Sequence, residues 1–418
     1  ATLPFEARCE LCGIRPAEGW DPAPGMPDIP ENRRPICRVC KTKRELGKDE
    51  GRGKVIDALR WMGYFGRREA LGIQPKDGWL AKDLDSLIPS GVRRKLIGIV
   101  YGDGNNFGRV SLGLRDIALG LQWAKRVEHT TQAATALALG QATQRAAALR
   151  GWQPGGNRTA LSRVPFQVLA LGGDDLSLFA WAPVAVYFAA EFTRLTDLEF
   201  QATGDDRLSK EPLTFSLGVL VTDEKTPVAR SVEFTEHQLM RWAKQASKNQ
   251  KLARGNVAML YAQTAEAIPS DLAQYRKSVY LLGREGGFRF CTTLRPWTAD
   301  EMEVLLVAAE QVLRRNDLGR LQRLTAAFYG ARQGVMAGLL YYAYQKARTA
   351  RDGTGGWIQK LEKELNGPKV ASQASVLLVH APYRDQSAVF GLPPESERTT
   401  VTWQAPLLDL LELAKLMS

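Results

Sequence analysis

Residues 96–108 read LIGIVYGDGNNFG, and this stretch decides the fold that the sequence predicts. It opens at 96–101 with a short apolar run rich in β-branched side chains, which indicates a buried strand. The run ends at a loop of glycine and asparagine that carries one acidic residue, Asp103. Residues 114–150 follow, and they predict a long helix because they are rich in alanine and hold few helix breakers.

The next segment predicts a hairpin of two strands. Residues 164–171, VPFQVLAL, indicate its first strand, GGDD at 172–175 its turn, and 176–181 its second strand. A helix over 184–195 and a strand over 214–221 complete a β-α-β-β-α-β order. This order is the ferredoxin-like core of palm domains, and we expect an α+β protein built on it.

Three aspartates in this pattern predict a metal site. The first strand of such a core lies beside the hairpin, so Asp103 would face Asp174 and Asp175 at the hairpin tip. Carboxylates gathered there can hold two Mg²⁺ ions, with Mn²⁺ as the alternative. Such ions lower the pKa of an attacking 3′-hydroxyl and neutralise the charge of a triphosphate. The pattern therefore indicates metal-dependent nucleotidyl transfer.

Glycines in the two loops favour the same chemistry. The GG of the turn allows a primed hairpin and lets phosphates approach the backbone, and the first loop would present backbone amides to phosphates at a helix start. Taken alone, each half is an ordinary hairpin turn or strand end, but both at the required positions favour an active site. The expected nucleotide-binding residues of the two loops are Gly104, Asn105, Asn106, Gly108, Gly172 and Gly173.

Four of the five cysteines form two Cys-x-x-Cys pairs, Cys9 with Cys12 and Cys37 with Cys40. Two such turns supply four thiolates to one tetrahedral Zn²⁺ and leave no open position, so we expect a structural zinc. A cytoplasmic location disfavours disulfides, whereas the spacing alone leaves an iron–sulfur cluster open. Cys291 lies in an apolar run and is expected to be a buried core residue.

The net charge of +11 favours polyanionic partners. Basic residues crowd over 33–54, and Arg241, Lys244, Lys248 and Lys251 recur at helical spacing. Each cluster alone is equally consistent with a solvated surface, but both together favour contact with nucleic acid or nucleotide. No apolar run approaches the roughly 20 residues that span a bilayer, and no secretory signal opens the chain. We therefore expect a soluble, cytoplasmic protein with no membrane partner.

These features predict four parts. They are a zinc-binding basic element at 1–54, a connecting helical segment at 55–94, a catalytic palm with the GGDD turn at 95–253, and a mainly helical C-terminal domain at 254–418. In the last part, residues 298–351 predict amphipathic helices.

The loop at 103–108 and the GGDD hairpin at 172–175 resemble the catalytic palm of the large subunit of type III CRISPR effector complexes. That family also places a four-cysteine zinc element ahead of the palm. Residues 214–227, TFSLGVLVTDEKTP, are similar to its strand-plus-loop segment, and a helical C-terminal domain follows. The resemblance covers nearly the whole chain, and the zinc element and the palm carry most of its specificity.

This resemblance implies an RNA-guided antiviral complex that converts ATP to cyclic oligoadenylates when target RNA is bound. It implies Asp103, Asp174 and Asp175 as the metal ligands, and guide RNA, target RNA and neighbouring subunits as partners. Ser216 and Lys225 become candidate nucleotide contacts, with a strand hydroxyl and a solvated loop charge as the structural alternatives.

Three departures from the family pattern qualify what it implies. Asn105 stands where the family usually has a second aspartate, and an amide carries no charge for a metal ion. No His-Asp dipeptide occurs, so we expect this sequence not to include the family's nuclease domain. Too few residues precede Cys9 for the family's first palm. We therefore expect the second palm on another chain, in a homodimer, or in a segment outside this sequence.

Two other functions stay open. One is a diguanylate-cyclase-like nucleotidyl cyclase, although those enzymes prefer glutamate where this chain has Asp175 and lack the four-cysteine element. The other is a catalytically silent palm scaffold that binds guide RNA and partner subunits. Magnesium-dependent turnover of ATP separates an enzyme from the scaffold, which would bind RNA and leave ATP untouched.

Overall fold

The computed structural model describes most of the palm and parts of the regions on either side of it. The described residues are 7–10, 15–22, 29–42, 81, 83–114, 116–151, 164–201, 213–249, 254–285, 288–291, 295–329, 379–380, 401–404 and 407–418. The chain divides into two compact units, Ala1–Gly63 and Tyr64–Ser418.

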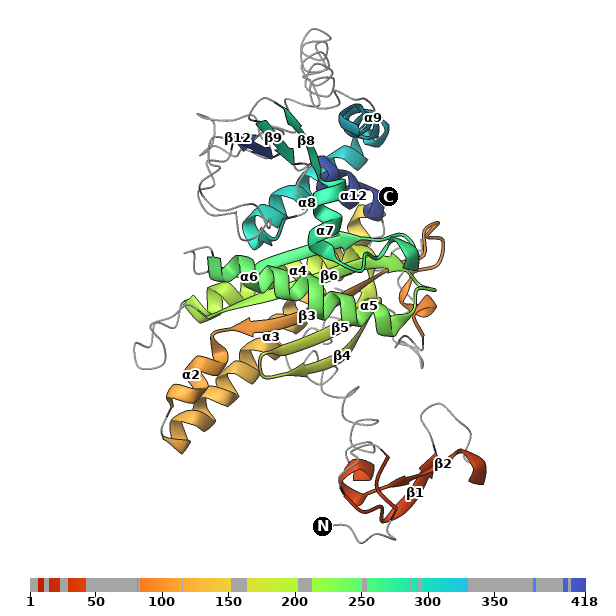
Figure 1. Ribbon diagram of the computed structural model, residues 1–418, viewed down its shortest axis with the longest axis vertical. Coiled ribbons are helices and arrows are strands. Elements are labelled where there is room, and N and C mark those ends of the chain that lie inside the picture. The colour runs from red at the N-terminus through yellow and green to blue at the C-terminus, as the bar shows by residue number, and fades with distance from the viewer. Residues whose placement is uncertain are drawn as a thin grey trace. The chain divides into compact units, whose positions relative to one another are not determined.

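The first unit is built on a short antiparallel ribbon, drawn in red in Figure 1. Strand β1 (Gly19–Pro22) pairs with β2 (Arg33–Ile36), and the 3₁₀ turn η1 (Pro30–Asn32) leads into β2. Its buried cluster consists of Cys9, Ile36 and Cys37, with Cys40 packed against it. Among the described residues of this unit, this cluster is a small core, which is the situation in which a bound metal ion stabilises a fold.

The second unit contains the predicted palm core. Its elements are β3 (Leu96–Asn105), α2 (Phe107–Gly113), α3 (Ile117–Leu149), β4 (Phe166–Gly172), β5 (Asp175–Trp181), α4 (Ala182–Gln201) and β6 (Thr214–Asp223). These strands are ordered β6-β3-β5-β4 and all neighbours run antiparallel. The predicted β-α-β-β-α-β order and its ferredoxin-like sheet are therefore confirmed.

The first palm strand is longer than the sequence pattern predicts. It continues through Gly102 and Asp103 to Asn105, because its last residues pair with β5 on one side and β6 on the other. Gly104 and Asn105 thus lie in a strand and not in a loop. The long helix predicted over 114–150 is present as α3, which begins after Asp116, whose side chain accepts from Ala118 N at 2.7 Å. A short helix that was not predicted, α2, precedes it and ends at Gly113.

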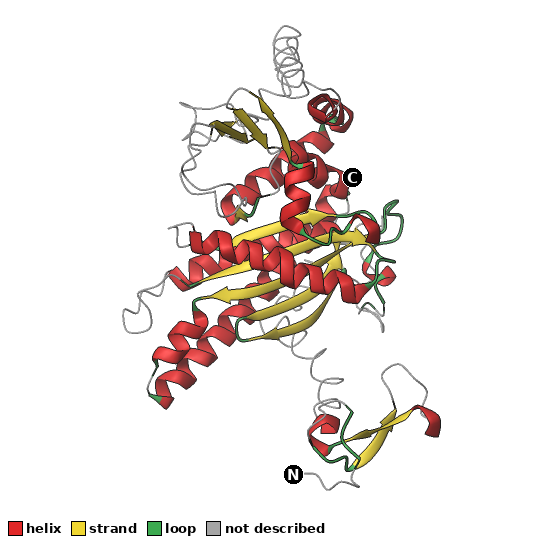
Figure 2. Ribbon diagram, in the orientation of Figure 1, coloured by secondary structure: helices red, strands yellow, loops and turns green. Residues whose placement is uncertain are grey.

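Helices cover both faces of this sheet (Figure 2). On one face lie α3 and α4, and on the other lie α5 (Val228–Phe234), the π-helix η4 (Thr235–Met240) and α6 (Arg241–Asn249). Successive side chains of each strand point to opposite faces of the sheet. Ile99 and Phe179 pack with Phe234 and Trp242 on the α6 face, whereas Gly98 faces α4 so closely that an added Cβ would lie 2.2 Å from Ala185 Cβ.

The sheet continues past residue 253, where the palm was predicted to end. Strand β7 (Asn256–Tyr261) runs parallel to β6, and β10 (Trp297–Thr298) pairs with β7, which gives the order β10-β7-β6-β3-β5-β4. The 3₁₀ turn η3 (Asp85–Leu87) precedes β3, and η5 (Ala265–Ala267) follows β7. Residues 55–80 of the predicted connecting segment lie outside the described residues.

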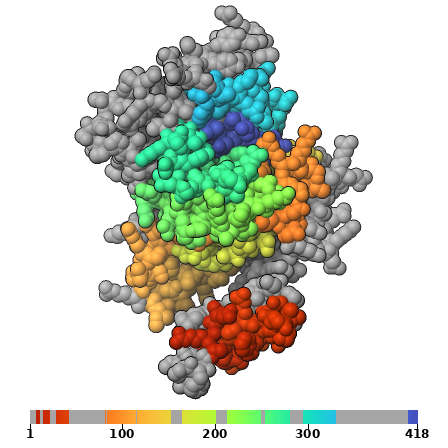
Figure 3. All heavy atoms as spheres, turned by 45° about the vertical axis from the view of Figure 1, so that its right-hand side comes forward, coloured from red at the N-terminus to blue at the C-terminus, as the bar shows by residue number. Residues whose placement is uncertain are grey.

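Helices predominate among the described C-terminal elements, as predicted, but a second sheet accompanies them. The helices are α7 (Leu272–Val279), α8 (Ala299–Arg314), α9 (Leu318–Tyr329) and α12 (Leu407–Met417), and Figure 3 shows the blue α12 among the cyan and green segments. The sheet has the order β11 (Val379–His380), β12 (Val401–Gln404), β9 (Phe288–Cys291), β8 (Leu281–Glu285). Cys291 is the last residue of β9. Its side chain is not among those that the structure describes, so its expected burial stays a prediction. Among the described helices, none is long and apolar enough to cross a membrane.

Candidate active site

Two of the predicted metal ligands face each other across neighbouring strands. Asp103 of β3 is paired with Asp175 of β5, and the amide of Gly104 donates to Asp174 O at 3.1 Å. This bond lies one residue beyond the pair, so Asp103 and Asp175 form a non-hydrogen-bonded pair, the kind in which facing side chains come closest. Both carboxylates therefore lie on the α6 face of the sheet. The structure brings the three predicted aspartates together at the hairpin tip.

The hairpin tip is a two-residue turn. Gly172 pairs with Asp175, and the turn residues between them are Gly173 and Asp174. Gly173 has φ +60°, whereas Asp174 is not in the left-handed region. A positive φ at the first turn residue alone is that of a type II′ turn, so the prediction of a primed turn is confirmed. An added Cβ at Gly172 or Gly173 would meet nothing within 4 Å, so the turn is open to a ligand.

Gly104 holds the hairpin tip against the end of β3. A Cβ at this position would lie 2.5 Å from the Phe107 ring and 2.7 Å from Asp174 Cβ, so no side chain fits. The Gly104 amide was predicted to contact phosphate, but it is engaged with Asp174 O. The reason is that the strand, and not a loop, continues to this point.

Lys244 completes the site, and the sequence pattern did not identify it as a site residue. It lies on α6, where its Nζ donates to the Asp103 carboxylate and to Gly104 O at 3.2 Å. The pattern showed it only as part of a basic helix face with Arg241, Lys248 and Lys251. Arg241 and Lys248 are exposed, and Lys251 lies outside the described residues. The available signal in the sequence was that Lys244 lies one helical turn from two other basic residues, on a helix near the end of the predicted palm.

Burial and the neighbouring carboxylates raise the affinity of Asp175 for a proton. The pKa of Asp175 is raised by partial burial first and then by the negative charges of Asp174 and Asp103, while Lys244 lowers it. Glu236 of η4 adds a further negative charge on the same face. Burial first, and then the charge of Glu236, raise the pKa of Tyr101. A site that gathers this much negative charge stabilises bound cations.

Asn105 and Ser216 lie beside Asp103, on the same face of the sheet, in a buried polar network. Asn105 Nδ2 donates to Thr214 Oγ1 and to Ser216 Oγ, each at 2.9 Å, and Ser216 Oγ lies 3.2 Å from Ser247 Oγ. Asn256 Nδ2 donates to the same Ser247 hydroxyl at 2.7 Å. The predicted nucleotide contacts of Asn105 and Ser216 stay predictions, and they would require these bonds to open.

The remaining predicted nucleotide contacts are spread more widely. Asn106 has φ +70° and its carbonyl accepts from Val110 N at 3.2 Å, so it turns the chain into α2, whose first turn carries the exposed Gly108. Lys225 follows the far end of β6. Since Asp223 pairs with Leu96 and Ser216 with Asp103, Lys225 lies more than about 20 Å along the strand from the aspartates. The structure does not bring Lys225 to this site.

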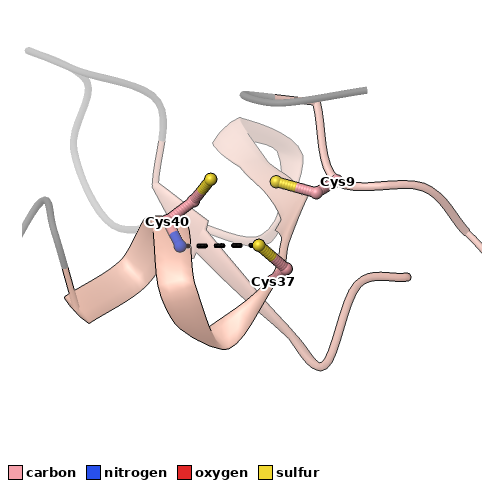
Figure 4. Close-up of side chains that lie close together, drawn as sticks. All are labelled: Cys9, Cys37 and Cys40. Atoms are coloured by element: carbon pink, nitrogen blue, oxygen red, sulfur yellow. Dashed lines mark hydrogen bonds between the residues drawn. The ribbon is translucent and has the colours of Figure 1, made fainter. Parts of the chain in front are cut away.

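A separate cluster in the first unit matches the predicted zinc element (Figure 4). The sulfurs of Cys9, Cys37 and Cys40 all lie within 4.8 Å of one another. Cys40 N donates to Cys37 Sγ at 3.4 Å, a bond that stabilises a thiolate ligand. Cys12 lies outside the described residues. Three sulfurs at this spacing fit a tetrahedral zinc site.

Among the described residues, this cluster is the one group of three or more histidine, cysteine, aspartate or glutamate side chains whose ligand atoms all lie within 4.8 Å of one another. The carboxylates of Asp103, Asp174 and Asp175 are adjacent in the sheet but do not converge to the same degree. Instead, Asp103 is turned to Lys244.

Comparison with known proteins agrees with this palm. Residues 97–253 match the family model of the Cas10/Cmr2 second palm domain. No curated protein matches the chain.

Several solved structures are similar at low identity. Csm1 of T. onnurineus is 15% identical with a TM-score of 0.41, over 82% of this chain and 41% of that one. A Csm1–Csm4 cassette in complex with cA3 is 13% identical with a TM-score of 0.39, over 79% of this chain and 38% of that one. The cassette with one ATP is 14% identical with a TM-score of 0.41, over 82% and 39%. The chain thus spans about two fifths of the length of these matched chains.

Proposed function

Residues 97–253 are a second palm domain of the Cas10/Cmr2 family, and on this premise we propose that the chain makes cyclic oligoadenylates from ATP. It would do so as a subunit of an RNA-guided type III CRISPR antiviral complex, when target RNA is bound. The observation that carries the proposal is the facing pair of Asp103 and Asp175 with Asp174 beside it in the turn. The choice of ATP follows from the family resemblance of the two loops.

The donor set at the hairpin tip fits Mg²⁺ or Mn²⁺. Asp103, Asp174 and Asp175 offer hard carboxylate oxygens on one edge of the sheet, and like charges directly opposite each other destabilise the strand pair unless a cation intervenes. When bound, the ions would lower the pKa of an attacking 3′-hydroxyl and offset the charge of the triphosphate.

The backbone of the turn would also contribute to binding and positioning. Gly172 and Gly173 carry no side chain and have open space around them, so phosphate oxygens can approach the turn. The II′ turn and the Gly104–Asp174 bond hold Asp174 and Asp175 at fixed positions relative to Asp103. Their role is to orient the reacting groups, since positioning supplies much of the catalysis of such displacements.

The partners follow from the same proposal. A cyclising site needs a second nucleotide opposite the first, which the family resemblance assigns to a second palm. This palm would belong to another polypeptide, to a second copy of the chain, or to a segment outside this sequence. Guide RNA, target RNA and neighbouring subunits would complete the complex.

The test is to incubate the purified assembly with ATP, Mg²⁺ and target RNA and to resolve the products by mass spectrometry. We expect cyclic adenylates from the wild-type chain and none from the double variant Asp174→Ala, Asp175→Ala. The control is Asp85→Ala, which removes an exposed carboxylate paired with Lys95 and should leave turnover unchanged.

Each result has a defined meaning. Turnover that persists in the double variant would show that the site assignment is wrong. A wild-type assembly that binds RNA and leaves ATP untouched would instead support the palm scaffold. Cyclic dinucleotides made from GTP would support the diguanylate-cyclase-like alternative.

A further inference from the structure

Four exposed arginines gather where α8 turns into α9, the two cyan helices of Figure 1. The connection is short, because α8 ends at Arg314 and α9 begins at Leu318, with Asn316 at φ +56° between them. The turn therefore brings the arginines of both helices close together. We call this group the arginine corner, and its members are Arg314, Arg315, Arg320 and Arg323.

The acidic side chains near the arginine corner are turned inward. Asp317 is the only acidic residue from 314 to 323, and its side chain is 8% exposed and pairs with Arg320 at 3.0 Å. Glu310 is 12% exposed and accepts from Arg145 at 2.6 Å, whereas Arg314 lies 3.6 Å from it, too far for a hydrogen bond. The surface therefore presents guanidinium groups whose charge is only partly neutralised.

The helix dipoles distinguish the two halves of the corner. Arg314 and Arg315 lie at the C-terminal end of α8, where the dipole favours a cation, so they have a structural role. Arg320 and Arg323 lie in the first two turns of α9, where the dipole disfavours a positive charge. Asp317 offsets Arg320, but Arg323 has no ion pair among the described residues. A negatively charged partner would explain this placement.

The exposed side of α9 fits an extended chain of phosphates. Ala326 is exposed and follows Arg323 by three positions, and Tyr329, 40% exposed, follows Ala326 by three more. Residues at this spacing are neighbours on a helix surface, so a small side chain separates the arginines from an aromatic ring. From Leu318 to Arg351 the sequence has no aspartate or glutamate. This side of the helix thus combines positive charge with a ring on which a base can stack.

Resting on the proposed function, which makes RNA a partner, we propose that the arginine corner binds a single strand of RNA by its phosphates. Arg320 and Arg323 donate to phosphate oxygens, and Tyr329 stacks on a base. All four basic residues are arginine, whose planar fork matches phosphate oxygens two at a time. The contact is independent of base sequence, because phosphates carry no sequence information.

The experiment measures binding of a fluorescently labelled single-stranded RNA of mixed sequence to the full chain, by anisotropy at several salt concentrations. We expect the double variant Arg320→Gln, Arg323→Gln to bind about tenfold more weakly at about 0.1 M salt. The slope of log affinity against log salt should fall by about 1.4, since each phosphate contact to a single strand contributes about 0.7. The matched control is Lys125→Gln with Lys277→Gln, which removes two exposed charges from α3 and α7.

Two further variants test the chemistry of the contact. Arg320→Lys with Arg323→Lys keeps both charges, so the salt slope should be unchanged while the affinity falls about threefold, because lysine cannot bind two oxygens at once. Tyr329→Ala should weaken binding without changing the slope. Thermal melting verifies folding, and Arg323→Gln alone, which breaks no described ion pair, replaces the double variant if that does not fold.

The outcomes separate the arginine corner from the proposed function. Equal weakening in the arginine and lysine double variants, or no binding of RNA by the wild type, would show that the corner is wrong. Displacement of the RNA by polyglutamate at equal charge would overturn it in favour of an acidic protein partner. Loss of RNA binding in the arginine variant of an assembly that leaves ATP untouched would support the corner and reject the cyclase. Cyclic adenylates from an assembly whose arginine variant binds RNA normally would reject the corner alone.

Discussion

At the scale of single residues, the site depends on a glycine, which has no side chain, as much as on the aspartates. Gly104 lets the Asp174 side chain and the Phe107 ring lie directly against the strand. Phe107 in turn packs edge-on against Phe200 and Phe215, with ring centroids 5.1 and 5.2 Å away, so the ring cannot retreat without disturbing its neighbours. The geometry of the aspartates is thus fixed by packing behind them.

This packing predicts the effect of Gly104→Ala. The added methyl would overlap both Asp174 and Phe107, so we expect a loss of about 1–3 kcal/mol in the free energy of unfolding. Denaturant unfolding measures it. The control is Gly108→Ala, whose Cβ meets nothing within 4 Å in a helix, and which should be neutral or slightly stabilising. Equal effects at the two glycines would contradict this account.

At the scale of elements, the junction of α4 with β7 is fixed by one carboxylate. Asp197 of α4 accepts from the amide of Gly255, just before β7, at 3.0 and 3.1 Å. The backbone at Gly255 lies close to β6, since a Cβ on Gly255 would lie 2.2 Å from Phe215 O. Because β7 pairs with β6 from Ser216 onward, this junction also places Asn256 in the polar network beside Asp103.

Asp197 predicts a pH dependence of stability. Its burial raises its pKa to about 7, although the Gly255 amide and Arg254 oppose this. The folded state therefore holds this proton where the unfolded chain, with a pKa of about 4, has lost it. It follows that the contribution of Asp197 to stability falls as pH rises from about 4 to about 7 and is then constant.

The variant that tests this is Asp197→Asn, which keeps an acceptor for Gly255 and cannot ionise. We expect it to be more stable than the wild type by about 1–4 kcal/mol at pH 7.5, with the difference shrinking towards pH 4. Thermal melting over this pH range measures the difference. Asp116→Asn is the control, because that exposed carboxylate also accepts from a backbone amide and should show little change.

At the scale of the second unit as a whole, a charged network joins the palm to the C-terminal helices. Arg145 of α3 donates to Glu303 and Glu310 of α8, each at 2.6 Å, and Tyr187 of α4 donates to Glu310 at 2.8 Å. Tyr187 Oη also lies 3.7 Å from Met417 Sδ of α12. One network therefore contacts four helices, two of the palm and two of the C-terminal region.

Loss of Arg145 should loosen this association. Arg145→Met would leave the largely buried Glu310 without its main counter-charge, and we expect a loss of about 2–4 kcal/mol in unfolding free energy. Arg314→Met is the matched control: Arg314 pairs with the same Glu310 at 3.6 Å but is 64% exposed, so its loss should cost under about 0.5 kcal/mol. Similar losses in both variants, measured by denaturant unfolding, would argue against the network.

The order of strands and helices in the palm follows from local signals. The apolar run before Asp103, the GGDD turn and the alanine-rich helix are each specified by neighbouring residues, because periodicity and turn chemistry act over a few positions. The same reasoning places Asp103 opposite the hairpin, since a ferredoxin-like order leaves one strand beside it. Local reasoning fails at the end of β3. There, pairing with β5 and β6 extends the strand into residues whose composition is that of a loop.

The sequence by itself therefore determined the palm, its three aspartates and the pairs of cysteines. Tertiary structure alone decided that Lys244 meets Asp103, that Asn105 is bonded to Thr214 and Ser216, and that β7 and β10 extend the sheet. Each of these contacts joins residues far apart in the chain, where no local period relates them. A lysine on a basic helix is the same in sequence whether it points to water or to a carboxylate, and only the packing of α6 distinguishes the two.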